Sequence, residues 1–268
     1  MIEFRTLGTV ELRAADGREL SSLLSQPKRI AVLAYLCIAQ PSGFQRRDTL
    51  MGLFWPDSDQ EHARASLRKA LHVLRRALGD DAILSRGDEE IAVNFERIFC
   101  DATEFASMVK ANRLEEALEI YRGNLLAGFF IDDAKEFEEW LQSQRTRLQV
   151  AAARAAFALS EQLESSGNVE AALIWLRRNI ELADTDERGV RKLITLQCKA
   201  GDRVGAFHAY DAFVQHLATE YQTEPTTDMR SLVERIRSGD HQPGDPKARA
   251  IPATEATGKE RKSSRPRS

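Results

Sequence analysis

Cysteine is scarce in this sequence, and its placement argues against two classes of protein. Only three cysteines occur among 268 residues, Cys37, Cys100 and Cys198, with no C-x-x-C pair and no histidine close by. A disulfide framework or a structural zinc site needs such clusters, so we expect neither disulfides nor a metal site. Each cysteine lies in an apolar or helical context, which indicates a buried thiol without a chemical role.

Long apolar runs are also missing. No stretch approaches the roughly 18 apolar residues that a membrane span needs, and the first five residues, MIEFR, lack the pattern of a signal peptide. We therefore expect a cytoplasmic protein with no membrane partner. The content of 43% hydrophobic and 29% charged residues is that of a soluble globular protein, and the length allows about two domains.

Groups that could perform catalysis do not converge anywhere in the sequence. An enzyme needs a nucleophile with a base, paired carboxylates or a glycine loop that holds phosphate. The five histidines are scattered, and Asp132 with Asp133 is more typical of a loop or a helix start than of a metal site. We expect no catalytic residue, no metal and no cofactor.

The first hundred residues change from a strand pattern to a helical one. Residues 2–5 and 10–13 alternate with period two, which predicts two short strands. Helical spacing then predicts a helix from Pro27 to about Cys37 and a second from about Arg46 to Phe54. After a third helix, residues 82–95 read as a hairpin that turns at Gly87 and Asp88. This order is typical of a winged helix-turn-helix domain with an additional small sheet, and we assign it to residues 1–98.

The third helix, expected over residues 59–78, has clear ends and one apolar side. Ser58 and Glu61 match the S-x-x-E capping box, and Gly79 stands where a left-handed C-terminal cap belongs. On a helical wheel its leucines form one narrow stripe that has to face the core, and two alanines extend this stripe. The stripe consists of Leu67, Leu71, Leu74 and Leu78 with Ala63 and Ala70.

The other side of this helix carries basic residues, and no acidic residue beyond the first turn of the helix offsets their charge. No Asp or Glu occurs between His62 and Leu78, although the whole chain has a net charge of −3. Like charges at i,i+4 destabilise a helix by a few tenths of a kcal/mol per pair, and the phosphates of DNA would offset that cost. We therefore expect the helix to enter the major groove of double-stranded DNA, as in other helix-turn-helix proteins. The expected DNA-contacting residues are Arg64, Arg68, Lys69, His72, Arg75 and Arg76.

Three arginines outside this helix are further candidates. Arg86 at the hairpin tip could reach the minor groove, and Arg46 and Arg47 open the second helix beside the phosphate backbone. Acidic residues at positions 57, 59 and 61 repel phosphates at the helix start. Contact with DNA is therefore expected to begin about one turn into the helix, at Arg64.

Residues 99–238 are helical almost throughout and contain an internal repeat. Leu159, Gly167, Ala172 and Leu176 are matched 34 residues later by equivalent positions, Leu193, Gly201, Ala206 and Tyr210. This period is the tetratricopeptide pattern of stacked helix pairs. Residues 113–121 resemble the second helix of a further, degenerate unit. The 17 Lys and Arg against 23 Asp and Glu in residues 101–238 suit a basic partner surface, and they equally suit simple solubility.

Residues 239–268 have a different composition. They contain four of the eight prolines and almost no bulky apolar residue, so we expect a disordered tail. Its basic end could add non-specific affinity for DNA, although a solvated tail is the simpler interpretation.

Several segments in register resemble the SARP/AfsR-type bacterial transcriptional activators. Those proteins combine an OmpR/PhoB-type winged helix with a tetratricopeptide-like bacterial transcriptional activator domain. The resemblance covers about residues 1–237, and it implies DNA binding near promoters and recruitment of RNA polymerase. The matching segments are residues 53–57 (LFWPD), 63–68 (ARASLR), 74–79 (LRRALG), 121–126 (YRGNLL), 136–141 (EFEEWL) and 220–225 (EYQTEP).

The chain departs from the family pattern at Tyr221 and Gln222, which replace the usual Leu-Gly pair. No receiver domain or P-loop segment is seen, so a signal is expected to enter in another way. The helical domain could bind a peptide or ligand, or form a homodimer. The alternative to a regulator is a helical-repeat scaffold for protein partners that does not bind DNA.

Overall fold

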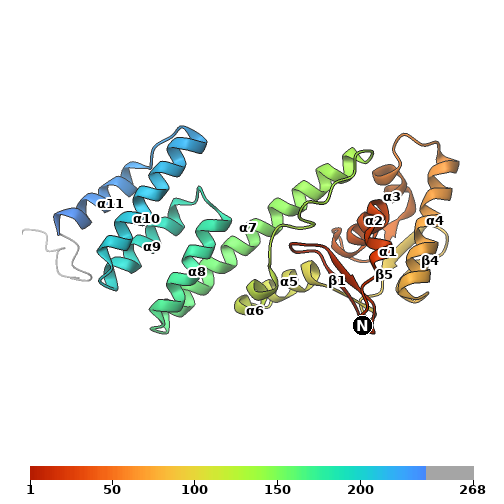
Figure 1. Cartoon of the computed structure of the whole chain (residues 1–268), viewed down its shortest axis with the longest axis horizontal. Coiled ribbons are helices and arrows are strands. Elements are labelled where there is room, and N and C mark those ends of the chain that lie inside the picture. The colour runs from red at the N-terminus through yellow and green to blue at the C-terminus, as the bar shows by residue number, and fades with distance from the viewer. Residues whose placement is uncertain (240–268) are drawn as a thin grey trace, which may run out of the picture. The chain divides into compact units, whose positions relative to one another are not determined.

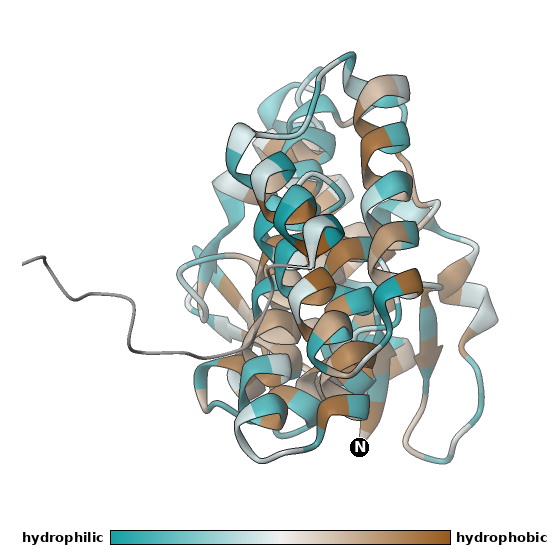
Figure 2. Cartoon of the chain, turned by 90° about the vertical axis from the view of Figure 1, so that its left-hand side faces the viewer, coloured by the Kyte–Doolittle hydropathy of each residue, from teal (hydrophilic) through white to brown (hydrophobic). Residues whose placement is uncertain are grey.

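A computed structural model of the chain describes residues 1–239 and divides into two compact units. The first is Met1–Pro225 and the second begins at Thr226. Hydrophilic and hydrophobic residues share the same helices (Figure 2), as expected of helices that bury one side. The tail predicted over residues 239–268 lies outside the described residues from position 240 on. In residues 1–239 no helix is long and apolar enough to cross a membrane.

The N-terminal part of the first unit is a winged helix-turn-helix with two small sheets (Figure 1). Each sheet has three strands, in the orders β2-β1-β6 and β3-β5-β4. The elements are β1 (Ile2–Arg5), β2 (Glu11–Arg13), α1 (Ser21–Leu24), α2 (Pro27–Ile38), β3 (Gln45–Arg46), α3 (Arg47–Phe54), α4 (Gln60–Leu78), β4 (Ile83–Arg86), β5 (Glu90–Val93) and β6 (Ile98–Cys100). The predicted fold class is confirmed, while α1, β3 and β6 were not predicted from the sequence.

The two sheets differ in what they connect: the first joins the N-terminal strands to β6, and the second contains the wing. Strand β1 runs antiparallel to β2 and parallel to β6, so the end of the winged helix returns to the N-terminus. Strands β4 and β5 form the predicted wing, with Arg86 opposite Glu90 across the turn. Helix α2 lies at the centre of this part, since every residue from Ile30 to Ile38 is buried.

The rest of the first unit is all-helical, and α7 leads from the winged helix into the helix pairs (Figure 1). Helices α7 and α8 pack together, as do α9 and α10, and α8 contacts α9. The elements are α5 (Asp101–Lys110), α6 (Leu114–Ile120), α7 (Lys135–Ser165), α8 (Val169–Leu182), α9 (Glu187–Lys199), α10 (Arg203–His216) and the π-helix η1 (Leu217–Tyr221).

The turns of the helix pairs explain the 34-residue period. Gly167 and Gly201 both have a φ of +85°, a conformation that favours glycine. The residue after each glycine then caps the next helix: Asn168 accepts from the Ala171 amide at 3.2 Å, and Asp202 accepts from the Gly205 amide at 2.8 Å. The predicted tetratricopeptide-like pairs are confirmed.

The winged helix and the helical part share one hydrophobic core. Phe54 of α3 packs on Phe137 of α7 with ring centroids 5.0 Å apart, and Tyr35 of α2 packs on Trp140 of α7 at 4.8 Å. Phe54, Phe137 and Trp140 come from two of the segments that carried the family resemblance. A single core cluster therefore continues across the expected boundary at residues 98 and 99.

Hydrogen bonds at the N-terminal sheet also join the winged helix to the helical part. The buried Asp101 carboxylate accepts from the Thr6 amide and hydroxyl, both at 2.7 Å, and from the Leu7 amide at 3.0 Å. Arg145 of α7 donates to the carbonyl oxygens of Leu125, Leu126 and Phe129 at 2.8–3.1 Å. Because Leu126 in turn donates to the Thr6 carbonyl, α7 is tied to β1 through the loop that precedes it.

The second unit contains one described helix, α11 (Thr227–Ser238). The Thr226 hydroxyl accepts from the Met229 amide at 3.4 Å and caps its start. Gly239, with a φ of +83°, ends it in a left-handed conformation.

Candidate nucleic-acid interface

Helix α4 begins one residue later than predicted, and its N-terminal cap is a different residue. The Asp59 carboxylate accepts from the His62 amide at 2.9 Å and also contacts the His62 ring at 2.6 Å. The proposed capping box of Ser58 and Glu61 is therefore wrong, because Asp59 has the extended conformation of a cap and supplies the oxygen. These contacts hold the pKa of Asp59 below its usual range.

The C-terminal end of α4 also differs in detail from the prediction. Gly79 follows the helix and has a positive φ of 104°, as expected, but its ψ of 147° is extended rather than left-handed helical. Chain reversal into β4 thus uses the freedom of glycine without a left-handed cap.

The leucine stripe and the cationic face of α4 are both present. Leu67, Leu71 and Leu74 are at most 1% exposed, and Leu78 is also buried. On the other side five of the six predicted residues are exposed: Arg64, Arg68, Lys69, His72 and Arg76. Within residues 1–239 none of these five forms an ion pair. The helix therefore presents a face of these five residues, which we call the α4 face, and none of its basic side chains is paired with a carboxylate of the described residues.

Arg75, the sixth residue, has a different environment. It is half-buried and donates from two nitrogens to the Ile83 carbonyl at 3.0–3.1 Å and to the Ser85 hydroxyl at 2.8 Å. It therefore fixes the wing strand β4 against the end of α4. The sequence placed Arg75 on the flank of the helix but gave no sign of this contact, which depends on where the wing folds back.

The three arginines outside α4 are held by the wing and its neighbours. Arg86 pairs with Glu90 and lies 4.5 Å from the centre of the Phe44 ring. Arg46 lies 3.9 Å from Asp48 and 4.0 Å from Glu89. Both side chains remain mostly exposed, so their existing partners are weak ones that solvent screens.

Arg47 lies deeper, at a recess between α3, α4 and the wing turn. Burial, followed by the charge of Arg75, lowers its pKa, although a guanidinium stays protonated. Its Nε is shielded from solvent and has no hydrogen-bond partner. The recess has a volume of about 610 Å³, and its lining includes Arg47, Arg64 and Arg68.

Acidic groups limit where a polyanion could enter this recess. Asp48, Asp88 and Glu89 line its other side, and they would repel phosphates near the wing turn. Arg64 and Arg68 line this recess together with the three carboxylates, so the α4 face has mixed charge where it meets the recess, while His72 and Arg76 lie outside it.

Trp55, which follows α3, packs within the protein. It is partly buried against the main core, and its ring lies 6.0 Å from that of Phe54. Lys28 stands over the Trp55 ring at 5.6 Å and pairs with Asp133 at 2.6 Å. Trp55 thus closes the junction between the winged helix and the loop before α7.

Comparison with known proteins identifies the family. Residues 104–237 match the family described as bacterial transcriptional activator domain. The chain belongs to this family. The resemblance to SARP/AfsR-type activators and the assignment to transcription regulation are thereby confirmed. The matched residues begin after α4, so the DNA contacts expected on α4 stay a prediction.

A solved structure has the same fold. The chain resembles "Mycobacterium tuberculosis EmbR in complex with low affinity phosphopeptide" with a TM-score of 0.64 and 24% identity, over 91% of this chain. The match spans 66% of that chain. Among curated proteins no match was found.

Proposed function

We propose that this protein is a transcriptional activator that binds double-stranded DNA by inserting α4 into the major groove. The observation that carries the proposal is the α4 face, on which Arg64, Arg68, Lys69 and Arg76 are exposed opposite a buried leucine stripe. Neutralising phosphates releases counterions, and an arginine can bind guanine with two hydrogen bonds.

The supporting residues have separate roles in this proposal. Arg75 holds the wing against α4, so we assign it a positioning role together with any contact to DNA. Arg46 and Arg47 would meet the phosphate backbone and Arg86 the minor groove, each after exchanging its present carboxylate neighbours for DNA. His72 lies on the exposed face between Arg68 and Arg76 and would contact the same groove.

Membership of the activator family supports proposals for the protein partner, the location and the role of the helical pairs. An activator brings RNA polymerase to a promoter, so RNA polymerase is the proposed protein partner, and the cytoplasm is the proposed location. Paired half-sites would require a homodimer, as in other helix-turn-helix proteins. The helical pairs of α7 to α10 would serve dimerisation, signal input or partner binding.

Substitution of two arginines tests the proposal. The double variant Arg68→Ala and Arg76→Ala should bind a DNA duplex more weakly by about 1–3 kcal/mol if either residue reads a base. Fluorescence anisotropy with a labelled duplex measures the affinity, and genome-wide mapping of bound sites supplies its sequence. Circular dichroism checks that the variant is folded.

The matched control is Arg147→Ala with Arg154→Ala, which removes two exposed arginines of α7. It should leave the affinity for DNA unchanged. Unchanged affinity in the α4 variant, with the fold intact, would favour the alternative of a helical-repeat scaffold that does not bind DNA.

A further inference from the structure

A second row of cations lies on α9, in a part of the chain whose total charge is negative. Residues 101–238 carry 17 Lys and Arg against 23 Asp and Glu, yet one side of α9 has no acidic residue. Arg188, Lys192 and Lys199 fall within about 40° of one another on a helical wheel. Arg191 lies about 60° further round, toward Glu187. The opposite side of α9, with Val190, Leu193, Ile194 and Leu196, is buried.

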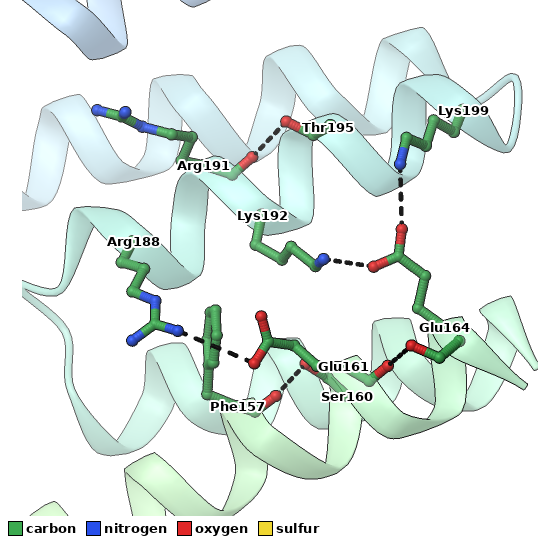
Figure 3. A network of polar contacts seen from close by, with 10 residues as sticks. Phe157, Ser160, Glu161, Glu164, Arg188, Arg191, Lys192, Thr195 and Lys199 are labelled. Atoms are coloured by element: carbon green, nitrogen blue, oxygen red, sulfur yellow. Dashed lines mark hydrogen bonds and ion pairs between the residues drawn. The ribbon is translucent and has the colours of Figure 1, made fainter. Parts of the chain in front are cut away.

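The α9 cations meet carboxylates of the neighbouring helix α7. Figure 3 shows Lys192 and Lys199 reaching Glu164, and Arg188 reaching Glu161. The Lys199–Glu164 distance is 3.1 Å and the Arg188–Glu161 distance is 3.9 Å. The contact with Lys192, followed by that with Lys199, lowers the pKa of Glu164, so this carboxylate is charged at neutral pH.

The carboxylates do not compensate the whole row. Glu164 is shared by two lysines, and the Arg188 side chain remains 69% exposed. Arg191 points away from α7 (Figure 3) and is not part of this surface. Arg154, an exposed residue one turn before Phe157 on α7, adds a further positive charge.

An apolar group lies among these charges. The guanidinium of Arg188 stands 4.0 Å from the centre of the Phe157 ring, which helps to hold it in place. Val150, one turn before Arg154 on α7, is 42% exposed. The surface formed by Arg154, Arg188, Lys192 and Lys199, which we call the α9 face, therefore offers positive charge beside exposed apolar area.

We propose that the α9 face is a docking surface for an acidic peptide segment of another protein. Four cations stand against the two carboxylates Glu161 and Glu164, so the face retains positive charge that an acidic partner would meet. Stacked helix pairs of this kind offer extended surfaces suited to peptides. The inference adds the chemistry of a partner segment for the helical pairs to the proposed function, and it does not depend on α4.

DNA is the less suitable polyanion for this surface. Glu161 and Glu164 lie among the cations, where they would repel a continuous line of phosphates. A peptide can place its carboxylates beside the free cations and its apolar side chains on Val150. The α4 face differs in this respect, since α4 itself has no acidic residue between His62 and Leu78.

Binding of a designed probe tests the proposal. The probe is a fluorescein-labelled peptide in which glutamate alternates with leucine, and its control has lysine in place of glutamate. We expect the glutamate peptide to bind the full chain at low salt, measured by fluorescence anisotropy, and the lysine peptide not to bind. Equal binding of both peptides, or binding of neither, would overturn the proposal.

Charge reversal locates the binding surface. The variant Arg154→Glu with Arg188→Glu should weaken binding of the glutamate peptide by roughly tenfold, whereas Lys110→Glu with Lys135→Glu makes the same charge change elsewhere and should not. Equal weakening in both variants would mean that only net charge matters and would overturn the proposal.

Two further measurements complete the test. Glu161→Gln keeps all the cations and removes one competing carboxylate, so it should strengthen peptide binding by roughly threefold. Unchanged or weaker binding in this variant would contradict the proposal even if the reversal variant failed to fold. Affinity for a DNA duplex should be unchanged in the Arg154→Glu, Arg188→Glu variant, and a loss there would assign the face to DNA instead.

Discussion

Helices α4 and α9 both expose a row of cations above a buried apolar side, but they compensate the charge differently. On the α4 face no carboxylate of the described residues pairs with Arg64, Arg68, Lys69 or Arg76, whereas on the α9 face Glu161 and Glu164 bridge to three of the cations. Uncompensated cations suit the uniform charge of a phosphate backbone. Cations with carboxylates among them suit a partner that alternates acidic and apolar groups.

Both faces lie in one compact unit, Met1–Pro225, and Phe137→Ala tests whether this unit unfolds as a whole, with the largest expected effect. Phe137 is fully buried between α7 and α3, so the variant should lose about 3–5 kcal/mol of stability. Urea unfolding followed by circular dichroism should still show one transition at a lower urea concentration. Two separate transitions would show that the winged helix and the helical pairs fold independently.

The control for this variant is Phe130→Ala, since Phe130 is 63% exposed. Removing its ring should change the free energy of unfolding by no more than about 0.5 kcal/mol.

Two glycine substitutions compare the packing around α9 with the packing around α3. A Cβ at Gly189, at the start of α9, would overlap the Asn179 side-chain oxygen on α8. Gly189→Ala should therefore cost about 1–3 kcal/mol, as overpacking does. Gly52 of α3 has no neighbour within 4 Å of such a Cβ, so Gly52→Ala should stabilise by about 0.5–1 kcal/mol. Thermal unfolding measures both, and equal shifts of the two variants would contradict this account of the α8–α9 packing.

Acid should weaken the carboxylate bridges of the α9 face, with the smallest expected effect. The pKa of Glu164 is lower in the folded chain than in the unfolded one. Its contribution to stability is thus present above the unfolded pKa and is lost as the pH falls through the folded pKa. The chain should exceed Glu164→Gln in stability by about 1 kcal/mol or less at neutral pH, and urea unfolding should show the difference vanish in acid. A stability difference that stays constant with pH would contradict a contribution from the ion pairs of Glu164.

Much of α4 could be predicted from the sequence because its buried side and its cationic side both follow from the spacing of nearby residues. Leucines at helical spacing show which side is buried, and the absence of acidic residues from 63 to 77 shows which side is cationic. The cap was predicted wrongly because Ser58 and Asp59 are adjacent and both are good cap residues. Only the backbone conformation decides between them.

Long-range contacts could not be predicted in this way. Strand β6 has three residues, too few for a period to be recognised, and its parallel pairing with β1 joins positions nearly a hundred residues apart. The contacts of Arg75 with Ile83 and Ser85 likewise depend on the wing folding back onto α4. The total charge of residues 101–238 also concealed the α9 face, which a helical wheel of residues 187–199 would have revealed.

The salt dependence of DNA binding tests the central claim most directly. If the chain neutralises four to six phosphates, the logarithm of the binding constant should fall against the logarithm of salt concentration with a slope of about −4 to −5. Arg64→Ala with Lys69→Ala should reduce the magnitude of that slope by about 2 if both residues contact phosphates, while Arg147→Ala with Arg154→Ala leaves it unchanged. A slope near zero in the parent protein, or the same slope in all three proteins, would contradict DNA binding through the α4 face.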